Sequence, residues 1–216
     1  MSYKVMNKHT FLGIWSLISV AIITFASCNR SNEDKADHLN KDGKTEEAIS
    51  YYQLAIKEGS IEAINKLALL YSNIHQPEKA KQYYIMAVEK GDKKAAETLA
   101  NLSLRDGAYH DVITYLKPIV DAGDTTQIYA LGSAFVKLKR YNEAVQVLLK
   151  NKDNVYVKAI LGEAYYELGD LNNAEKYWKS AVYNHQSGGI NSYNKLLDLY
   201  RQQGREKDYK ELEGAY

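Results

Sequence analysis

The sequence predicts an all-α protein, an α-solenoid of about six helix-turn-helix repeats. Three segments align without gaps, at 55–71, 87–103 and 119–135, and their glycines Gly59, Gly91 and Gly123 recur every 32 residues. Within a copy, apolar residues recur at three- and four-residue steps, which is the pattern of an amphipathic helix. A fixed period of this length is typical of stacked repeats, in which each copy buries its apolar face against the next.

Each copy is predicted to be a hairpin of two helices joined by a tight turn. Pro77 begins a second helix, where its missing N–H costs no hydrogen bond. A left-handed residue is expected to end each first helix, and glycine suits that conformation. His75 and Lys139 occupy this position in two copies, and glycine occupies it in the others, at Gly43, Gly107, Gly169 and Gly204. Helix N-caps are predicted at aspartates that follow a glycine, Asp92, Asp124 and Asp170.

The N-terminus has the pattern of a secretory signal peptide. Lys4 and Lys8 precede an uncharged, largely apolar run over 11–26. As a helix this run would be about 24 Å long, which is shorter than the hydrocarbon core of a bilayer. A basic start, a short apolar stretch and small residues at its end predict a signal peptide over 1–27.

The end of this segment resembles the processing signal of bacterial lipoproteins. Ala26 and Ser27 are small residues, and they directly precede Cys28, the only cysteine of the chain. The resemblance implies that Cys28 receives a lipid and becomes the first residue of the mature protein. Asn29 then favours the outer over the inner membrane of the cell envelope. An uncleaved membrane anchor remains the alternative.

The rest of the chain divides into a short polar tether and the repeats. Residues 28–35 are predicted to be the lipidated cysteine and its tether, and residues 36–216 the repeat domain. Without residues 1–27 the chain has 26 Lys and Arg against 27 Asp and Glu, a formal net charge of −1. A nucleic-acid-binding protein needs an excess of basic residues, so we expect no nucleic-acid partner.

The repeats resemble a known family. The segment 159–184 carries its pattern at Leu161, Gly162, Tyr165, Gly169, Ala174, Trp178 and Ala181. This spacing resembles the tetratricopeptide repeat, and the joint between copies is similar to the related Sel1-like repeat. The resemblance implies a right-handed solenoid that binds other proteins on its concave face.

No set of residues in the sequence indicates catalysis. A Gly-x-Ser-x-Gly elbow and a His-Glu-x-x-His motif are both absent from the sequence, and a single cysteine excludes a cysteine-based zinc cluster. Acidic pairs such as Glu46 and Glu47 stand near helix starts, where they favour the helix dipole. We therefore expect no enzyme activity, metal or cofactor.

The candidate binding surface is the concave face, which first-helix positions would line. Asparagine can hydrogen-bond a peptide backbone, and tyrosine supplies rigid contact area. The tyrosine-containing pairs Tyr51–Tyr52, Tyr83–Tyr84 and Tyr177–Trp178 fall on second helices, so they are interpreted mainly as core. The predicted groove residues are Asn65, Lys66, Asn73, Asn101, Arg105, Tyr129, Lys137, Tyr156, Glu163, Tyr166 and Asn194.

These features together predict a membrane-anchored scaffold that holds an extended or helical segment of another protein, within an envelope assembly complex. Two other functions stay open. One is a lipoprotein that binds glycans or small ligands, which an exposed cluster of Tyr129, Tyr156 and Tyr166 would favour. The other is a regulatory subunit of a cell-wall enzyme.

Overall fold

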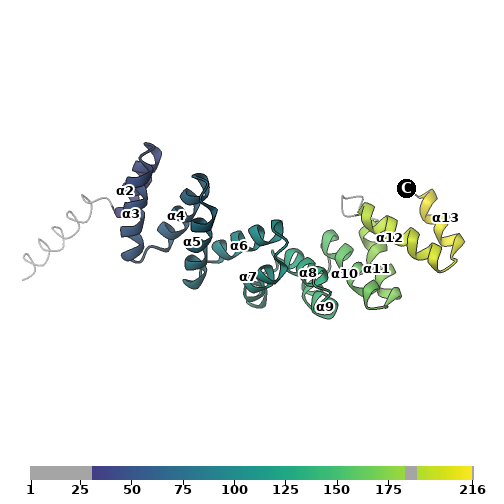
Figure 1. Cartoon of the computed structure of the whole chain (residues 1–216). Coiled ribbons are helices and arrows are strands. Elements are labelled where there is room, and N and C mark those ends of the chain that lie inside the picture. Colours follow the sequence, from purple (N-terminus) through teal and green to yellow (C-terminus); the bar gives the residue numbers. More distant parts are fainter. Residues whose placement is uncertain (1–30, 183–188, 216) are drawn as a thin grey trace, which may run out of the picture. The chain divides into compact units, whose positions relative to one another are not determined.

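The computed structural model describes residues 31–182 and 189–215. In these ranges the chain forms α-helices, one 3-10 helix and no strand (Figure 1). The helices are α2 (Asn32–Lys41), α3 (Thr45–Lys57), α4 (Ile61–Asn73), α5 (Pro77–Glu89), α6 (Lys93–Arg105), α7 (Tyr109–Asp121), α8 (Ile128–Lys137), α9 (Tyr141–Leu148), η1 (Leu149–Asn151), α10 (Val155–Glu167), α11 (Leu171–Val182), α12 (Gly189–Gln202) and α13 (Glu206–Gly214). The predicted all-α fold of repeated hairpins is confirmed.

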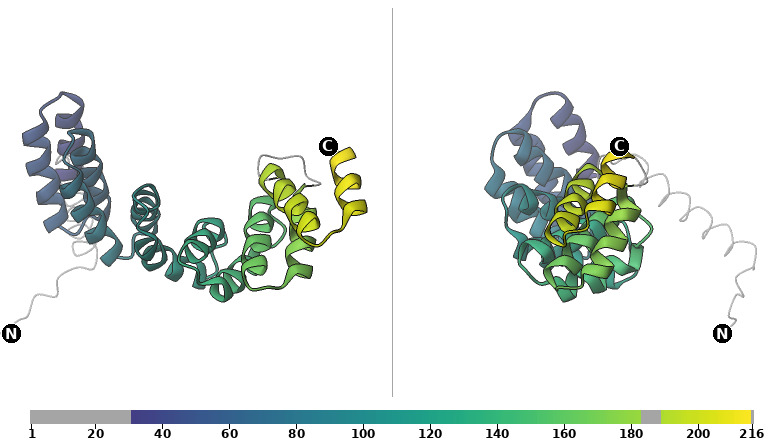
Figure 2. Two further views of the ribbon diagram at one scale, coloured as in Figure 1. Left: turned by 45° about the vertical axis from the view of Figure 1, so that its right-hand side comes forward. Right: turned by 90° about the vertical axis from the view of Figure 1, so that its right-hand side faces the viewer.

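The helices pair into hairpins within two compact units, unit 1 up to Lys90 and unit 2 from Gly91. In unit 1, α2 packs on α3 and α4 packs on α5. In unit 2 the pairs are α6 with α7, α8 with α9, α10 with α11, and α12 with α13, and the two helices of a hairpin lie side by side (Figure 2). The first helices of the last three hairpins also contact one another. Helix α8 packs on α10 and α10 packs on α12, so these three helices form a continuous face of unit 2.

The turn inside each hairpin is closed by one left-handed residue. Gly43, Gly107, Gly169 and Gly204 have φ angles of 75°, 69°, 79° and 65°. His75 and Lys139 adopt the same conformation, each with φ of 58°, although a side chain is disfavoured there. The predicted turn position therefore holds in all six copies, including the two that lack glycine.

The first described helix begins before residue 36, the predicted start of the repeats. The Ser31 hydroxyl accepts a hydrogen bond from the backbone N–H of Asp34 at 3.0 Å and caps α2, which begins at Asn32. Residues 32–35, predicted as tether, are therefore the first turn of a helix. The polar composition that suggested a tether is also what an N-terminal turn favours, since Glu33 and Asp34 complement the helix dipole.

Two of the three predicted aspartate caps are confirmed. Asp92 accepts from the N–H of Ala95 at 2.9 Å, and Asp170 accepts from the N–H of Asn173 at 3.1 Å. The prediction for Asp124 is wrong, because α8 begins later, at Ile128. The Asp124 carboxylate instead accepts from the N–H and hydroxyl of Thr126, which makes a local turn before the helix.

Close approach of paired helices shapes the core of unit 2. Buried residues such as Leu131, Phe135 and Leu161 form a cluster that runs from α6 to α10. Gly132 in α8 lies against Leu148 of α9, and a Cβ atom there would be 2.3 Å from the leucine Cδ2. The small residues of the repeat thus set the distance between its two helices.

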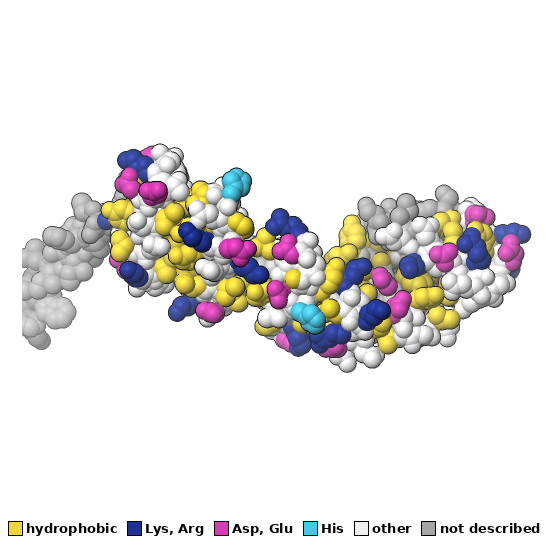
Figure 3. Space-filling model, in the orientation of Figure 1, with side chains coloured by type: hydrophobic (Ala, Val, Ile, Leu, Met, Phe, Trp, Pro, Cys, Tyr) yellow, Lys and Arg dark blue, Asp and Glu magenta, His cyan; other side chains and the backbone are white. Residues whose placement is uncertain are grey.

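The surface of the described chain carries mixed charge. Figure 3 shows Lys and Arg side chains interspersed with Asp and Glu over the face of each unit that it draws. Over residues 31–182 and 189–215, no helix combines the length and the apolar composition needed to cross a bilayer. The predicted signal segment and Cys28 lie outside the described residues.

Candidate protein-binding site

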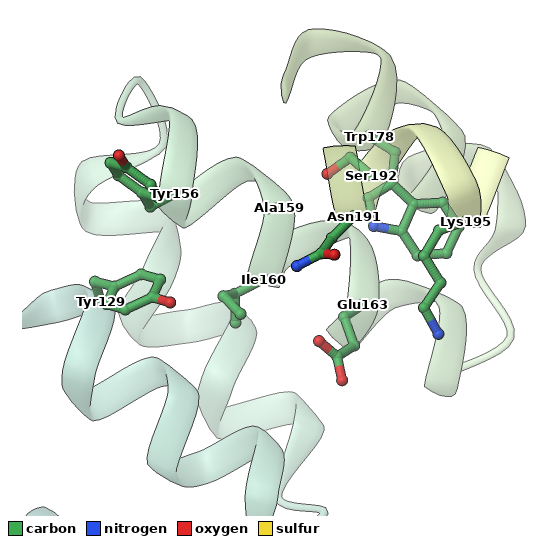
Figure 4. A pocket seen from close by; sticks show the side chains of 9 residues that line it. All are labelled: Tyr129, Tyr156, Ala159, Ile160, Glu163, Trp178, Asn191, Ser192 and Lys195. Atoms are coloured by element: carbon green, nitrogen blue, oxygen red, sulfur yellow. The ribbon is translucent and has the colours of Figure 1, made fainter. Parts of the chain in front are cut away.

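A hollow of about 110 Å³ lies on the first-helix face of unit 2. It opens between α8, α10 and α12, and α11 lies behind it. Figure 4 shows the two tyrosines on one side, Asn191 and Lys195 on the other, and Ile160 between them. We call it the α10 hollow, and its lining residues are Tyr129, Tyr156, Ala159, Ile160, Glu163, Trp178, Asn191, Ser192 and Lys195.

Helix α10 supplies the floor because its residues share one face. Tyr156, Ile160 and Glu163 stand four and three residues apart, which places them in one row along the helix. Asn154 caps α10 by accepting from the N–H groups of Tyr156 at 2.9 Å and Val157 at 3.3 Å. This cap fixes the start of the helix, and with it the position of Tyr156.

Two exposed aromatic rings form one end of the α10 hollow. Tyr129 of α8 and Tyr156 of α10 are 46% and 43% exposed. Their ring centroids are 6.0 Å apart at an interplanar angle of 72°, an edge-to-face arrangement that aromatic pairs favour. The pair presents a preorganised apolar surface to solvent.

The other end of the α10 hollow is lined by polar side chains that are available to bind a ligand. The side chains of Glu163, Asn191 and Lys195 make no hydrogen bond or ion pair with any residue that the structure describes. Together they offer a carboxylate acceptor, an amide that both donates and accepts, and an ammonium donor. Their formal charges cancel, so the site attracts polar groups without favouring one sign of charge.

The back of the α10 hollow is formed by Trp178, which also belongs to the core. Its side chain is 2% exposed and its ring lies 5.5 Å from that of Tyr166. Of the predicted core aromatics, Tyr52 is likewise 2% exposed and Tyr84 is half-buried. The interpretation of these positions as mainly core is confirmed for Tyr52 and Trp178.

The structure brings together three of the eleven predicted groove residues, Tyr129, Tyr156 and Glu163. Tyr166 lies next to them but donates its hydroxyl to Gln202 at 3.2 Å, so it joins α10 to α12 instead of lining the hollow. The others do not line the hollow: Asn101 and Arg105 are on α6, Lys137 is at the end of α8, Asn194 is on α12, and Asn65, Lys66 and Asn73 are on α4 of unit 1.

Lys66 joins α4 to α2 in unit 1 through a cluster of ion pairs. Its ammonium is 2.7 Å from Glu33, 2.8 Å from Asp37 and 3.2 Å from Glu62, and Tyr52 donates its hydroxyl to Asp37 at 2.6 Å. Burial alone would raise the pKa of Asp37, but the hydrogen bonds from Lys66 and Tyr52 outweigh it and lower that pKa. Because two of the three carboxylates around the ammonium lie on α2, Lys66 ties α4 to α2.

Sequence reasoning missed the part of the hollow contributed by α12. Asn191 and Lys195 stand one turn apart on the same helix face, whereas Asn194 was predicted there. A signal was present in the four-residue spacing of Asn191 and Lys195. Ile160 was also missed, although it lies one turn after Tyr156.

The comparisons with known proteins agree with this fold. The tetratricopeptide repeat model matches residues 128–150 and 156–183, which include the α8 and α10 walls of the hollow. No curated protein sequence matches the chain. The chain is similar to several solved structures of MamA, all at low sequence identity.

MamA of AMB-1 aligns with a TM-score of 0.54 and 16% identity, over 69% of this chain and 87% of that one. A further crystal structure of MamA gives a TM-score of 0.53 and 20% identity, over 70% and 88%. MamA from Desulfovibrio magneticus RS-1 gives 0.50 and 16%, over 69% and 90%. The family model identifies tetratricopeptide repeats over residues 128–150 and 156–183, and the MamA structures share the fold of the chain.

Proposed function

We propose that the protein is an interaction scaffold that holds a segment of another protein in the α10 hollow, while a lipid on Cys28 confines both to a membrane of the bacterial envelope. The observation that supports partner binding is the surface of the hollow, where exposed tyrosine rings lie with polar side chains that have no hydrogen-bond or ion-pair partner among the described residues. Exposed aromatic rings in a fixed geometry and partnerless polar groups are features of protein-binding surfaces. The repeat fold supports the same class of function.

The envelope location rests on the sequence. A short apolar segment followed by Ala26, Ser27 and Cys28 matches the lipoprotein signal, and Asn29 favours the outer membrane. We place this activity in an envelope assembly complex.

The experiment is site-specific photo-crosslinking in intact cells. A photoreactive amino acid is placed at Tyr156, in the hollow, and in parallel at Leu168, which is 40% exposed at the end of the same helix but outside the hollow. We expect discrete crosslinked partners from position 156 that are missing from position 168. Equal patterns at both positions, or none at 156, would contradict the proposal.

A second candidate is the binding of glycans, which the exposed pair of Tyr129 and Tyr156 favours, since sugar rings stack on aromatic faces. Asn191, Glu163 and Lys195 would then hydrogen-bond sugar hydroxyls. Binding of purified protein to a glycan array, lost in Tyr156→Ala, would support this candidate over the scaffold.

A further inference from the structure

We infer that the α10 hollow recognises an extended, uncharged peptide segment that inserts one large apolar side chain beside Ile160. This inference rests on the proposed scaffold function and specifies the chemistry of its partner. It follows from three properties of the hollow, which are its length, the order of its chemical groups and its net charge.

The length of the hollow fits a few extended residues. Tyr156 and Glu163 are seven residue steps apart along the helix, about 10 Å at ~1.5 Å per residue. An extended chain rises ~3.3 Å per residue, so about three of its residues cover this row. An α-helix is about 10–12 Å wide with its side chains, so only the side chains of one of its faces could enter the hollow.

The order of groups along α10 separates an apolar end from a polar end. Tyr129 and Tyr156 form the apolar end, Ala159 and Ile160 line the middle, and Glu163 lies at the polar end with Asn191 and Lys195 across from it. A large apolar side chain in the middle would contact Ile160 and the tyrosine rings. The main chain next to it would then reach the polar groups.

The charges of the polar end favour peptide main chain over charged side chains. A basic side chain drawn to Glu163 would also meet the ammonium of Lys195, and an acidic one drawn to Lys195 would meet Glu163. A peptide group carries both an N–H donor and a C=O acceptor, so it can satisfy the carboxylate, the amide and the ammonium together. An extended segment has such groups available, whereas a helix uses them internally.

The test uses the full chain with Trp15→Phe, because Trp178 then becomes the only tryptophan and reports on the hollow that it lines. Its fluorescence is followed while blocked heptapeptides of glycine and serine are added, with leucine, phenylalanine or alanine at the centre. We expect the leucine and phenylalanine peptides to bind about tenfold or more tightly than the alanine peptide. Methylation of the main-chain nitrogens that flank the central residue should weaken binding further.

Variants locate the site. Tyr156→Ala and Asn191→Ala should each weaken binding of the leucine peptide severalfold, and Leu168→Ala, outside the hollow, should leave it unchanged. Equal binding of the alanine peptide, no binding at millimolar peptide, or stronger binding of a charged peptide overturns the inference. The scaffold function is tested separately by the crosslinks from position 156, so it can stand if this inference fails.

Discussion

The backbone of Gly162 in α10 lies directly against the indole ring of Trp178 in α11. A Cβ atom at position 162 would lie 2.3 Å from Cδ1 and 2.4 Å from Nε1 of that ring. Since Trp178 is buried and also forms the back of the α10 hollow, this contact couples the packing of the hairpin to the shape of the binding site.

Gly162→Ala should therefore destabilise unit 2 by about 1–3 kcal/mol, because the indole must shift in a packed core. The overpacking outweighs the gain of up to ~1 kcal/mol that alanine brings to a helix interior. Denaturant unfolding measures the change. Gly214→Ala is the control, because a Cβ there meets nothing within 4 Å, and it should be neutral or slightly stabilising.

The last hairpin is held by a carboxylate with four donors around it. Glu175 of α11 accepts two hydrogen bonds from Arg205, at 2.6 and 3.1 Å, and one from Tyr200 at 3.0 Å, and it pairs with Lys179 at 2.6 Å. Hydrogen bonding to Arg205 is the main cause that lowers the pKa of Glu175 to about 2. Glu175→Gln should cost about 1–3 kcal/mol of stability at neutral pH.

The pH dependence of this cluster has a defined sign. The pKa of Glu175 is lower in the folded than in the unfolded chain, so its stabilisation is complete above about pH 5 and is lost as pH falls toward 2. The stability difference between the native protein and Glu175→Gln should therefore shrink over that interval. Glu213→Gln, an exposed site on α13, should show no such difference. A difference that stays constant down to pH 2 would contradict the assignment.

Replacing Lys139, which adopts a left-handed conformation in its turn, by glycine should increase the stability of the protein. A non-glycine residue with φ of 58° carries a cost of about 1–2 kcal/mol that glycine avoids. Lys139→Gly should stabilise the protein by about 0.5–1 kcal/mol, once the greater entropy of unfolded glycine is subtracted. Lys139→Ala keeps the Cβ atom and should show no gain, and thermal unfolding separates the two variants.

The fold could be predicted from the sequence because the repeats recur at a nearly fixed spacing. A fixed repeat places His75 and Lys139 at the hairpin turn by position, even where the residue itself gives no sign of it. The same argument explains why Tyr156 and Glu163 were found, since both lie on a helix whose register the repeat fixes. A period shows which helix face a residue occupies, and this was enough to predict three of the nine residues that line the hollow.

The other lining residues and the role of Lys66 could not be predicted from the repeat spacing, because they depend on contacts between helices. Asn194 stands two residues before Leu196, as Tyr129 stands two before Leu131, yet Asn191 and Lys195 line the hollow and Asn194 does not. Lys66 lies on the predicted row, but its role is set by Glu33 and Asp37 on another helix. Pairing between distant charged side chains is a property of the folded structure.

The last prediction concerns Cys28. If this residue carries the lipid, Cys28→Ala should abolish labelling by a clickable fatty acid and move the protein from the membrane fraction. Ser27→Ala is the matched control, because it keeps a small residue before the cysteine and should leave both properties intact. Loss of the lipid should also reduce the crosslinks from Tyr156, if a shared membrane raises the local concentration of the partner. A Cys28→Ala variant that remains membrane-bound without label would point to a retained apolar segment as the anchor.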